Sequence, residues 1–267
     1  MWQHVTVAWR SGLRSRSFHA LFVLGLLAVS GAYLAAQFSA RQPATVALDV
    51  CISCVRFIAL LMMIFWCQEL VAREVERRTV FLALTYPVPR SSYLLGRYIG
   101  VVMLAAAAIG ILGLMTLSSA YLAGSEYLQA TPINLRGGLA LTLLCILVDV
   151  AVVGAVTMLI TTISTTPLLP LALGAAFAIA ARGWGQAMDL LRDKTGGPAD
   201  LEGALRPALD AMRWVLPDLG RLDVRAAALY DQWPAGPALL WSVATSLAYI
   251  VVVLAFSVLV FRRRQFD

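Results

Sequence analysis

Few residues in this sequence could do chemistry, and two of them are charges inside long apolar stretches. Arg56 and Asp149 each lie near the middle of such a stretch. A charge at the centre of a bilayer costs about 2.5–3.5 kcal/mol or more unless it is paired or hydrated. Both stretches are expected to run in the same direction, so the two residues should lie at similar depth. We therefore predict an intramembrane Arg56–Asp149 ion pair, which could be structural or could line the path of a charged substrate.

The sequence offers no complete catalytic set of a kind that works inside a membrane. Intramembrane hydrolases need a Ser–His pair, paired aspartates or a metal site built from His and Glu. The histidines His4 and His19 both lie at the N-terminal edge of the first apolar stretch, and Asp149 has no second aspartate at mid-membrane. We predict no catalytic residue.

Cys51 and Cys54 form a C-x2-C motif, which can bind a metal or cycle as a dithiol. They lie in an apolar stretch without a histidine nearby in the sequence, as do Cys67 and Cys145. Small apolar packing residues are the favoured interpretation, so neither a metal site nor a disulfide framework is predicted.

These residues belong to a very apolar chain. Of its 267 residues, 60% are hydrophobic and 13% are charged, whereas a soluble domain carries roughly 25% charged residues. A membrane-spanning helix needs about 20 mostly apolar residues. We therefore predict an all-α polytopic membrane protein with six transmembrane helices, at approximately 18–38, 46–67, 94–123, 138–163, 168–190 and 237–261.

The positions of the arginines predict the orientation of the chain. The positive-inside rule places arginine-rich segments in the cytoplasm, so we predict a multi-pass protein of the cytoplasmic (inner) membrane with both termini inside. Nucleic-acid binding is disfavoured, because the cations flank apolar stretches instead of forming a basic run in a polar region. The decisive inner residues are Arg10, Arg14, Arg16, Arg73, Arg77, Arg78, Arg90 and Arg262–Arg264, against Arg41 and Arg136 in the outer loops after the first and third spans.

We interpret residues 1–267 as a single transmembrane domain with three extramembrane parts. In residues 1–17, Trp2, Val5, Trp9 and Leu13 share one helical face, which predicts an interfacial amphipathic helix. Residues 68–93 form an inner segment. Residues 192–236 predict outer helices that partly re-enter the membrane, with a short helix over 224–230. This outer segment could contact a periplasmic or extracellular partner.

The fifth apolar stretch carries the small-residue run GAAFAIAARG, from Gly174 to Gly183. Small residues let helices approach closely, so this run predicts a packed helix interface. We expect Arg182 to extend to the outer surface.

The inner segment begins with a charged helix. Glu69 with Arg73, and Glu74 with Arg78, are spaced four residues apart with the acid first, which stabilises a helix. An apolar run follows, and prolines then end the helix. Such a segment can dock in a soluble partner and pass its motion to the spans, but an ordinary solvated helix–loop explains it equally well.

The order E-x3-R-T, an apolar run, P-V-x-R and Y-L-L-G-R resembles the first cytoplasmic loop of ABC-2 type permeases. The whole layout resembles that family too, and residues 216–219 (Leu-Pro-Asp-Leu) are similar to a segment of its NosY-like branch. The loop pattern consists of Glu74, Arg78, Thr79, Pro87, Val88, Arg90, Tyr93, Leu94, Leu95, Gly96 and Arg97.

The resemblance implies a type V ABC exporter-like transmembrane domain that pairs with a second permease, in a homodimer or a heterodimer. It also implies two copies of a separate P-loop ATPase subunit that bind ATP and Mg and drive export, with no cofactor in this chain. The residues implied in ATPase coupling are Glu69, Arg73, Glu74, Arg77, Arg78, Thr79, Phe81, Leu82, Pro87 and Arg90.

The sequence agrees that ATP hydrolysis belongs to another chain. A Walker A loop needs a lysine after a glycine-rich loop, and the only lysine, Lys194, has no such loop before it. Two alternatives remain: a secondary transporter that uses Asp149 and Arg56 as an ion site, and a membrane assembly factor on the same scaffold. No residue names a substrate.

Overall fold

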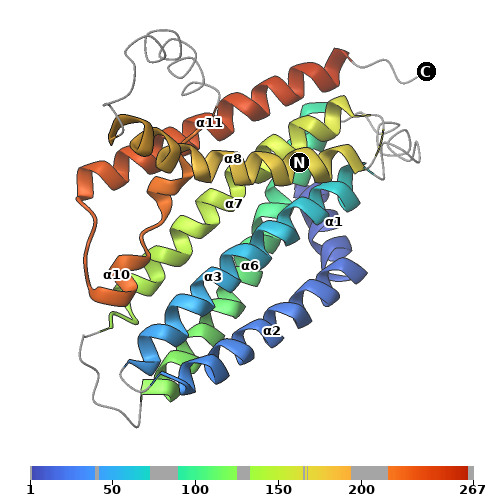
Figure 1. Cartoon of the computed structure of the whole chain (residues 1–267). Helices are drawn as coiled ribbons and strands as arrows, with labels where there is room; N and C mark the ends of the chain where they lie inside the picture. Colours follow the sequence, from blue (N-terminus) through green and yellow to red (C-terminus); the bar gives the residue numbers. More distant parts are fainter. Residues whose placement is uncertain are drawn as a thin grey trace.

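The computed structural model describes residues 2–39, 42–72, 90–124, 133–164, 166, 168–193 and 216–263. Within these ranges all regular secondary structure is helical. Six helices are long and apolar enough to cross a membrane, which confirms the predicted all-α architecture. They are α2 (Arg16–Gln37), α3 (Pro43–Cys67), α6 (Arg90–Gly124), α7 (Gly137–Ile163), α8 (Leu168–Asp193) and α11 (Gly236–Arg263) (Figure 1).

Four shorter elements complete the described part of the chain. The N-terminal helix α1 (Trp2–Leu13) precedes the first span, and the π-helical turn η1 (Gln68–Ala72) continues α3 without a break. The 3-10 turn η2 (Leu219–Leu222) and the helix α10 (Arg225–Tyr230) lie between α8 and α11. The predicted short helix over 224–230 corresponds to α10.

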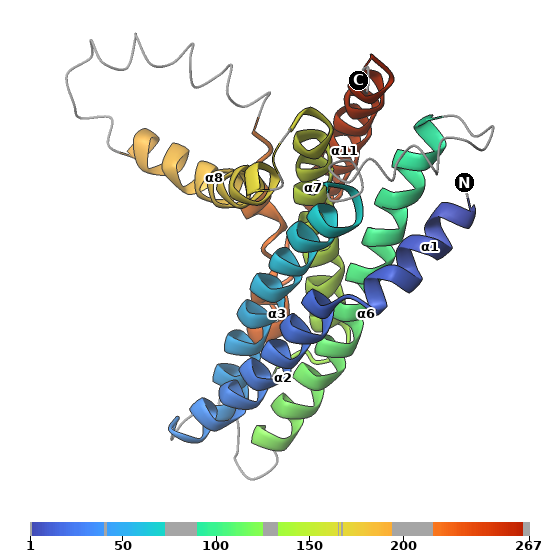
Figure 2. The same cartoon turned by 90° about the vertical axis from the view of Figure 1, so that its right-hand side faces the viewer.

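The three central helices are α3, α6 and α7, which are largely buried, whereas α2, α8 and α11 are largely exposed. The helix α2 packs along α3 and α6, α11 packs along α7, and α8 projects sideways from the bundle (Figure 2). The exposed faces are apolar: Leu34, Ile179 and Val251 are 63%, 75% and 66% exposed. Apolar faces of this size are stable in a bilayer, whose interior is itself an apolar solvent.

Both ends of the described chain lie at the same end of the bundle. Figures 1 and 2 show α1 and the last turns of α11 at this end, which we call the proximal end. The connection from α2 to α3 and the start of α7 lie at the opposite, distal end. This arrangement agrees with the prediction that the two termini lie on one side of the membrane.

The helix α1 is held against α6 by small residues. A Cβ atom added to Gly100 of α6 would lie 2.5 Å from the Cβ of Ala8 and 3.2 Å from the carbonyl oxygen of Val5. Ala8 is fully buried. The two helix backbones therefore approach as closely as a glycine allows, and this contact fixes α1 on the proximal half of the bundle.

The predicted apolar stripe of α1 is correct only in part. Val5 is buried and Trp9 packs against the core, as expected, but Leu13 is 37% exposed. Ala8 and Gly12, which the stripe does not include, face α6 instead. The reason is steric, because close packing of two helices selects small residues at the contact and turns large ones outward.

Two glycine substitutions on the same helix test this contact. Gly100→Ala should lower the free energy of unfolding by about 1–3 kcal/mol, because the added methyl group overpacks against Ala8. Alanine at Gly110, whose added Cβ meets no atom within 4 Å, should be neutral or stabilising by up to about 1 kcal/mol, since alanine favours helix. Thermal unfolding in detergent micelles measures both, and equal effects at the two positions would contradict the close approach of α1.

Candidate functional site: a charge network inside the bundle

The chain between α8 and α11 packs back into the bundle. The turn η2 contacts α8, and α10 contacts α7 and α3. A Cβ atom added to Gly138, at the start of α7, would collide with the backbone of Ala227 and would lie 2.8 Å from the Cα of Ala228. Glycine at this position lets α10 lie directly on α7. Residues 216–230, which we call the inserted segment, thereby reach the inside of the bundle.

Asp223 of the inserted segment forms a two-pronged ion pair with Arg56 of α3. Arg56 Nη1 lies 2.7 Å from Asp223 Oδ2, and Arg56 Nη2 donates a hydrogen bond of 3.0 Å to Asp223 Oδ1. Arg56 is buried at mid-span. This is the fork geometry in which arginine binds carboxylate most strongly, and it ties the inserted segment to the middle of α3.

A second arginine, Arg225, shares the same carboxylate. Its Nη2 donates to Asp223 Oδ2 over 2.6 Å, and its Nε donates to Asp223 Oδ1 over 3.0 Å. Its Nη1 donates to Asp49 Oδ1 of α3 over 3.2 Å. Burial alone would raise the pKa of Asp223, but hydrogen bonds from Arg225 and Arg56 outweigh it and hold that pKa well below its ordinary value.

The other buried acid, Asp149 of α7, is paired with Arg182 of α8. Arg182 Nη2 donates a hydrogen bond to Asp149 Oδ2, and Asp149 is only 1% exposed. The expectation that Arg182 extends to the surface is therefore wrong. Desolvated carboxylates need a cation close by, and α8 supplies one to α7. The small-residue run is packed at its first residue, Gly174, which contacts Thr157 of α7.

The predicted direct Arg56–Asp149 pair is not formed among the described residues. Each residue instead has another partner, Asp223 for Arg56 and Arg182 for Asp149. The two do lie within electrostatic range of each other, as similar depth requires. The prediction considered only charges inside apolar stretches. It missed Asp223, which enters from a polar segment, and it assigned Arg182 of the fifth apolar stretch to the outer surface.

These ion pairs form two electroneutral groups, Asp149–Arg182 and Arg56–Asp223–Arg225–Asp49, which we together call the charge network. Three carboxylates and three guanidinium groups balance, so none requires a charged ligand for neutrality. One group joins α7 to α8, and the other joins α3 to the inserted segment. The members of the network are Asp49, Arg56, Asp149, Arg182, Asp223 and Arg225.

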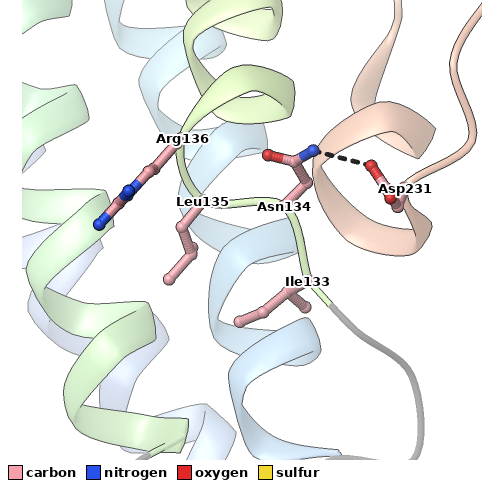
Figure 3. A pocket seen from close by; sticks show the side chains of 5 residues that line it. All are labelled: Ile133, Asn134, Leu135, Arg136 and Asp231. Atoms are coloured by element: carbon pink, nitrogen blue, oxygen red, sulfur yellow. Dashed lines mark hydrogen bonds between the residues drawn. The ribbon is translucent and has the colours of Figure 1, made fainter.

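A second polar cluster fastens the far end of α10 to the start of α7. Asn134 Oδ1 accepts hydrogen bonds from the amides of Gly137 (3.0 Å) and Gly138 (3.1 Å), which caps α7. Its Nδ2 donates to Asp231 Oδ1 over 2.7 Å (Figure 3). Trp233 Nε1 donates to the same oxygen over 2.9 Å. Sequence reasoning missed this cluster, although an asparagine shortly before an apolar stretch is a helix-start signal.

The cluster borders a cavity of about 340 Å³ at the distal end, lined by Ile133, Asn134, Leu135, Arg136 and Asp231. In Figure 3 the Arg136 side chain points away from Asp231, so the two charges do not converge on one ligand position. The cavity follows from the way Asn134 bridges two helices.

The cysteines of the C-x2-C motif lie in α3, and all four cysteines are free thiols. Cys51 is buried, and its Sγ lies 3.3 Å from Ser119 Oγ of α6. This contact fits the interpretation of Cys51 as a packing residue between the two central helices.

Most of the residues implied in ATPase coupling lie outside the described ranges. Glu69 belongs to η1 and is half-buried, and Arg90 is the first residue of α6. The remaining eight are Arg73, Glu74, Arg77, Arg78, Thr79, Phe81, Leu82 and Pro87. In the chain, these eight residues lie between η1 and α6.

Comparison with protein families decides the identity of this bundle. A family model described as ABC-2 family transporter protein matches residues 44–179, slightly more than half of the chain. The chain belongs to the ABC-2 transporter family. The match runs from α3 into α8 and so contains Arg56 and Asp149. A comparison with curated proteins finds no match.

Membership makes the chain a multi-pass membrane permease of the ABC type. Permeases of this family act with an ATPase partner and are not generally catalytic themselves. The charge network therefore lies in a transport subunit.

A double-mutant cycle tests the ion pair between Arg56 and Asp223 of the permease. Arg56→Gln and Asp223→Asn should each lower the free energy of unfolding by roughly 1–3 kcal/mol, since each removes the charged hydrogen bonds between the two side chains. The double mutant should lose clearly less than the sum. Arg221→Gln is the matched control, because that arginine has only a surface ion pair, worth about 0–1 kcal/mol. Additive losses would contradict the pair.

The depressed pKa of Asp223 sets the pH range over which this pair acts. A carboxylate with a lowered folded-state pKa contributes fully above its unfolded pKa, about 3.9, and loses that contribution as the pH falls through the folded value. The stability difference between the wild type and Asp223→Asn should therefore stay constant from about pH 8 to about pH 5. Thermal unfolding over this range checks it, and a difference that vanishes near pH 6 would overturn the assignment.

Proposed function

We propose that this permease is the membrane-spanning subunit of an ATP-driven exporter, moved by nucleotide binding and hydrolysis on a separate P-loop ATPase chain. The main observation that supports this proposal is that the buried helix α3 continues directly into η1. The turn η1 in turn precedes the segment that resembles an ATPase-coupling loop. That segment ends at α6, the second central helix. Force applied to it would act directly on the core of the bundle.

The turn η1 is suited to pass on such a force. π-helical turns are rare and are frequently found at functional sites. Leu70 of η1 is buried, and η1 contacts α7, α8 and α1 as well as α3. A displacement of η1 would therefore reach four helices. We propose that Glu69 and the predicted coupling residues after it form the ATPase contact.

The proposal includes an orientation and an assembly. The proximal end would face the cytoplasm from the inner membrane, with both termini and α1 on that side. Two ATPase copies would bind ATP and Mg, and two permease copies would pair, in a homodimer or a heterodimer. The exposed apolar faces of α2, α8 and α11 provide area for a second copy as well as for lipid. We also propose that the permease belongs to the NosY-like branch. Residues 192–236 would bind a partner on the outer side of the membrane.

Affinity purification of the tagged permease in mild detergent, followed by mass spectrometry, tests the ATPase contact. The wild type should recover a stoichiometric P-loop ATPase. Replacing Glu74 and Arg78 together by alanine should lower its recovery by at least roughly tenfold, the effect expected when interface hot-spot residues are truncated.

The matched control replaces Arg10 and Arg14 of the proximal end together by alanine. Both are exposed on the same predicted side, and this variant should keep the ATPase. Recovery of the wild-type chain without an ATPase from several detergents would contradict the proposal. It would favour a secondary transporter built around Asp149 and Arg56.

A further inference from the structure

Two polar atoms of the charge network have no hydrogen-bond partner among the residues that the structure describes. They are Oδ1 of Asp149 and Nε of Arg56. Both side chains are more than nine-tenths buried, with Asp149 1% and Arg56 8% exposed. A buried charged group with an unused donor or acceptor is unfavourable, and such groups in native proteins usually have a specific reason.

The two atoms belong to groups of opposite charge on two helices that pack against each other, α3 and α7. Arg56 lies on α3 and Asp149 on α7, each near the middle of its span. Cys145, one turn before Asp149, lies within range of Arg56, Asp149 and Asp223. Arg56 therefore lies near two carboxylates and is hydrogen-bonded to only one of them.

Both carboxylates tolerate a change of partner. If Arg56 left Asp223, that carboxylate would keep the hydrogen bonds from Nε and Nη2 of Arg225. If Arg56 approached Asp149, it would meet the unused Oδ1, while Oδ2 would stay bonded to Arg182. All six charges of the network remain paired in either arrangement, so the change leaves no isolated charge in the bilayer.

We propose that Arg56 exchanges partners between Asp223 and Asp149. When it binds Asp223, Arg56 holds the inserted segment to the middle of α3; we call this exchange the latch. In the arrangement seen here, Arg56 holds Asp223 and the segment is docked. In the alternative, Arg56 holds Asp149. The segment then loses its ion pair with the middle of α3 and keeps the Arg225–Asp49 ion pair and the packing of α10 on α7.

The exchange links the inserted segment to the proximal end of the bundle. Asp149 and Asp223 lie on different elements, so any shift of α3 relative to α7 changes the distances from Arg56 to the two acceptors unequally. Since α3 continues into η1, the movement of the proposed coupling segment would bias the choice. This last link rests on the proposed function; the exchange itself is a property of the isolated chain.

Breaking the Asp149–Arg182 pair from either side distinguishes a latch from a static structural pair. Asp149→Asn removes the competing acceptor, so Arg56 should stay on Asp223. Arg182→Gln leaves the Asp149 carboxylate without its partner, so it should attract Arg56 away from Asp223. Hydrogen–deuterium exchange of the full-length permease in nanodiscs measures the result at the amides of Asp223 and Ala227, which donate to backbone carbonyls within the segment.

We expect exchange at these amides to slow in Asp149→Asn and to accelerate by roughly tenfold in Arg182→Gln, the size expected for redirecting a charged hydrogen bond. In an Arg56→Gln background, neither variant should change exchange further. Acceleration in both single variants would show a purely structural pair and would overturn the latch.

Two controls keep the outcome interpretable. Arg182→Lys keeps the positive charge beside Asp149 and should exchange like the wild type. Amides of α6 between Val101 and Leu112 belong to a helix that contributes no residue to the network. They should stay unchanged in every variant and report an intact bundle. Failure of the latch in this test leaves the ATPase copurification result untouched, so the two proposals fail separately.

Discussion

Charged side chains are stable inside a bilayer only when each has a partner, and this constraint decides how the permease is assembled. Arg56 at mid-span draws Asp223, and with it a segment outside the six spans, into the bundle. Asp149 likewise holds α8 to α7 through Arg182. These ion pairs add to the packing contacts that position the inserted segment and α8.

Close backbone contacts complement the ion pairs. Lipid-exposed helices gain little from burying apolar side chains, because the bilayer is already apolar. Glycines are therefore important at the close helix contacts. Gly100 lets α1 approach α6, Gly138 lets α10 approach α7, and Gly174 lets α8 approach α7. The result is a buried centre of three helices, with more exposed elements packed around it.

The arrangement suits a transport subunit. The centre is continuous with η1 at one end, and the charge network joins it to the inserted segment further along. A permease needs movement at one end of the membrane to be felt at the other. A neutral network in which one arginine lies near two acids has two arrangements, and every charge has a partner in both.

The sequence by itself determined the class of fold, the number and approximate limits of the spans and the family, because these follow from hydropathy and from local residue order. It also located Arg56 and Asp149 as the charges that needed partners. It did not determine the partners. Asp223 and Arg182 are distant in the chain, and only helix packing brings them to Arg56 and Asp149. Tertiary structure decided the pairing, because an ion pair depends on distances of a few ångströms that no local sequence pattern encodes.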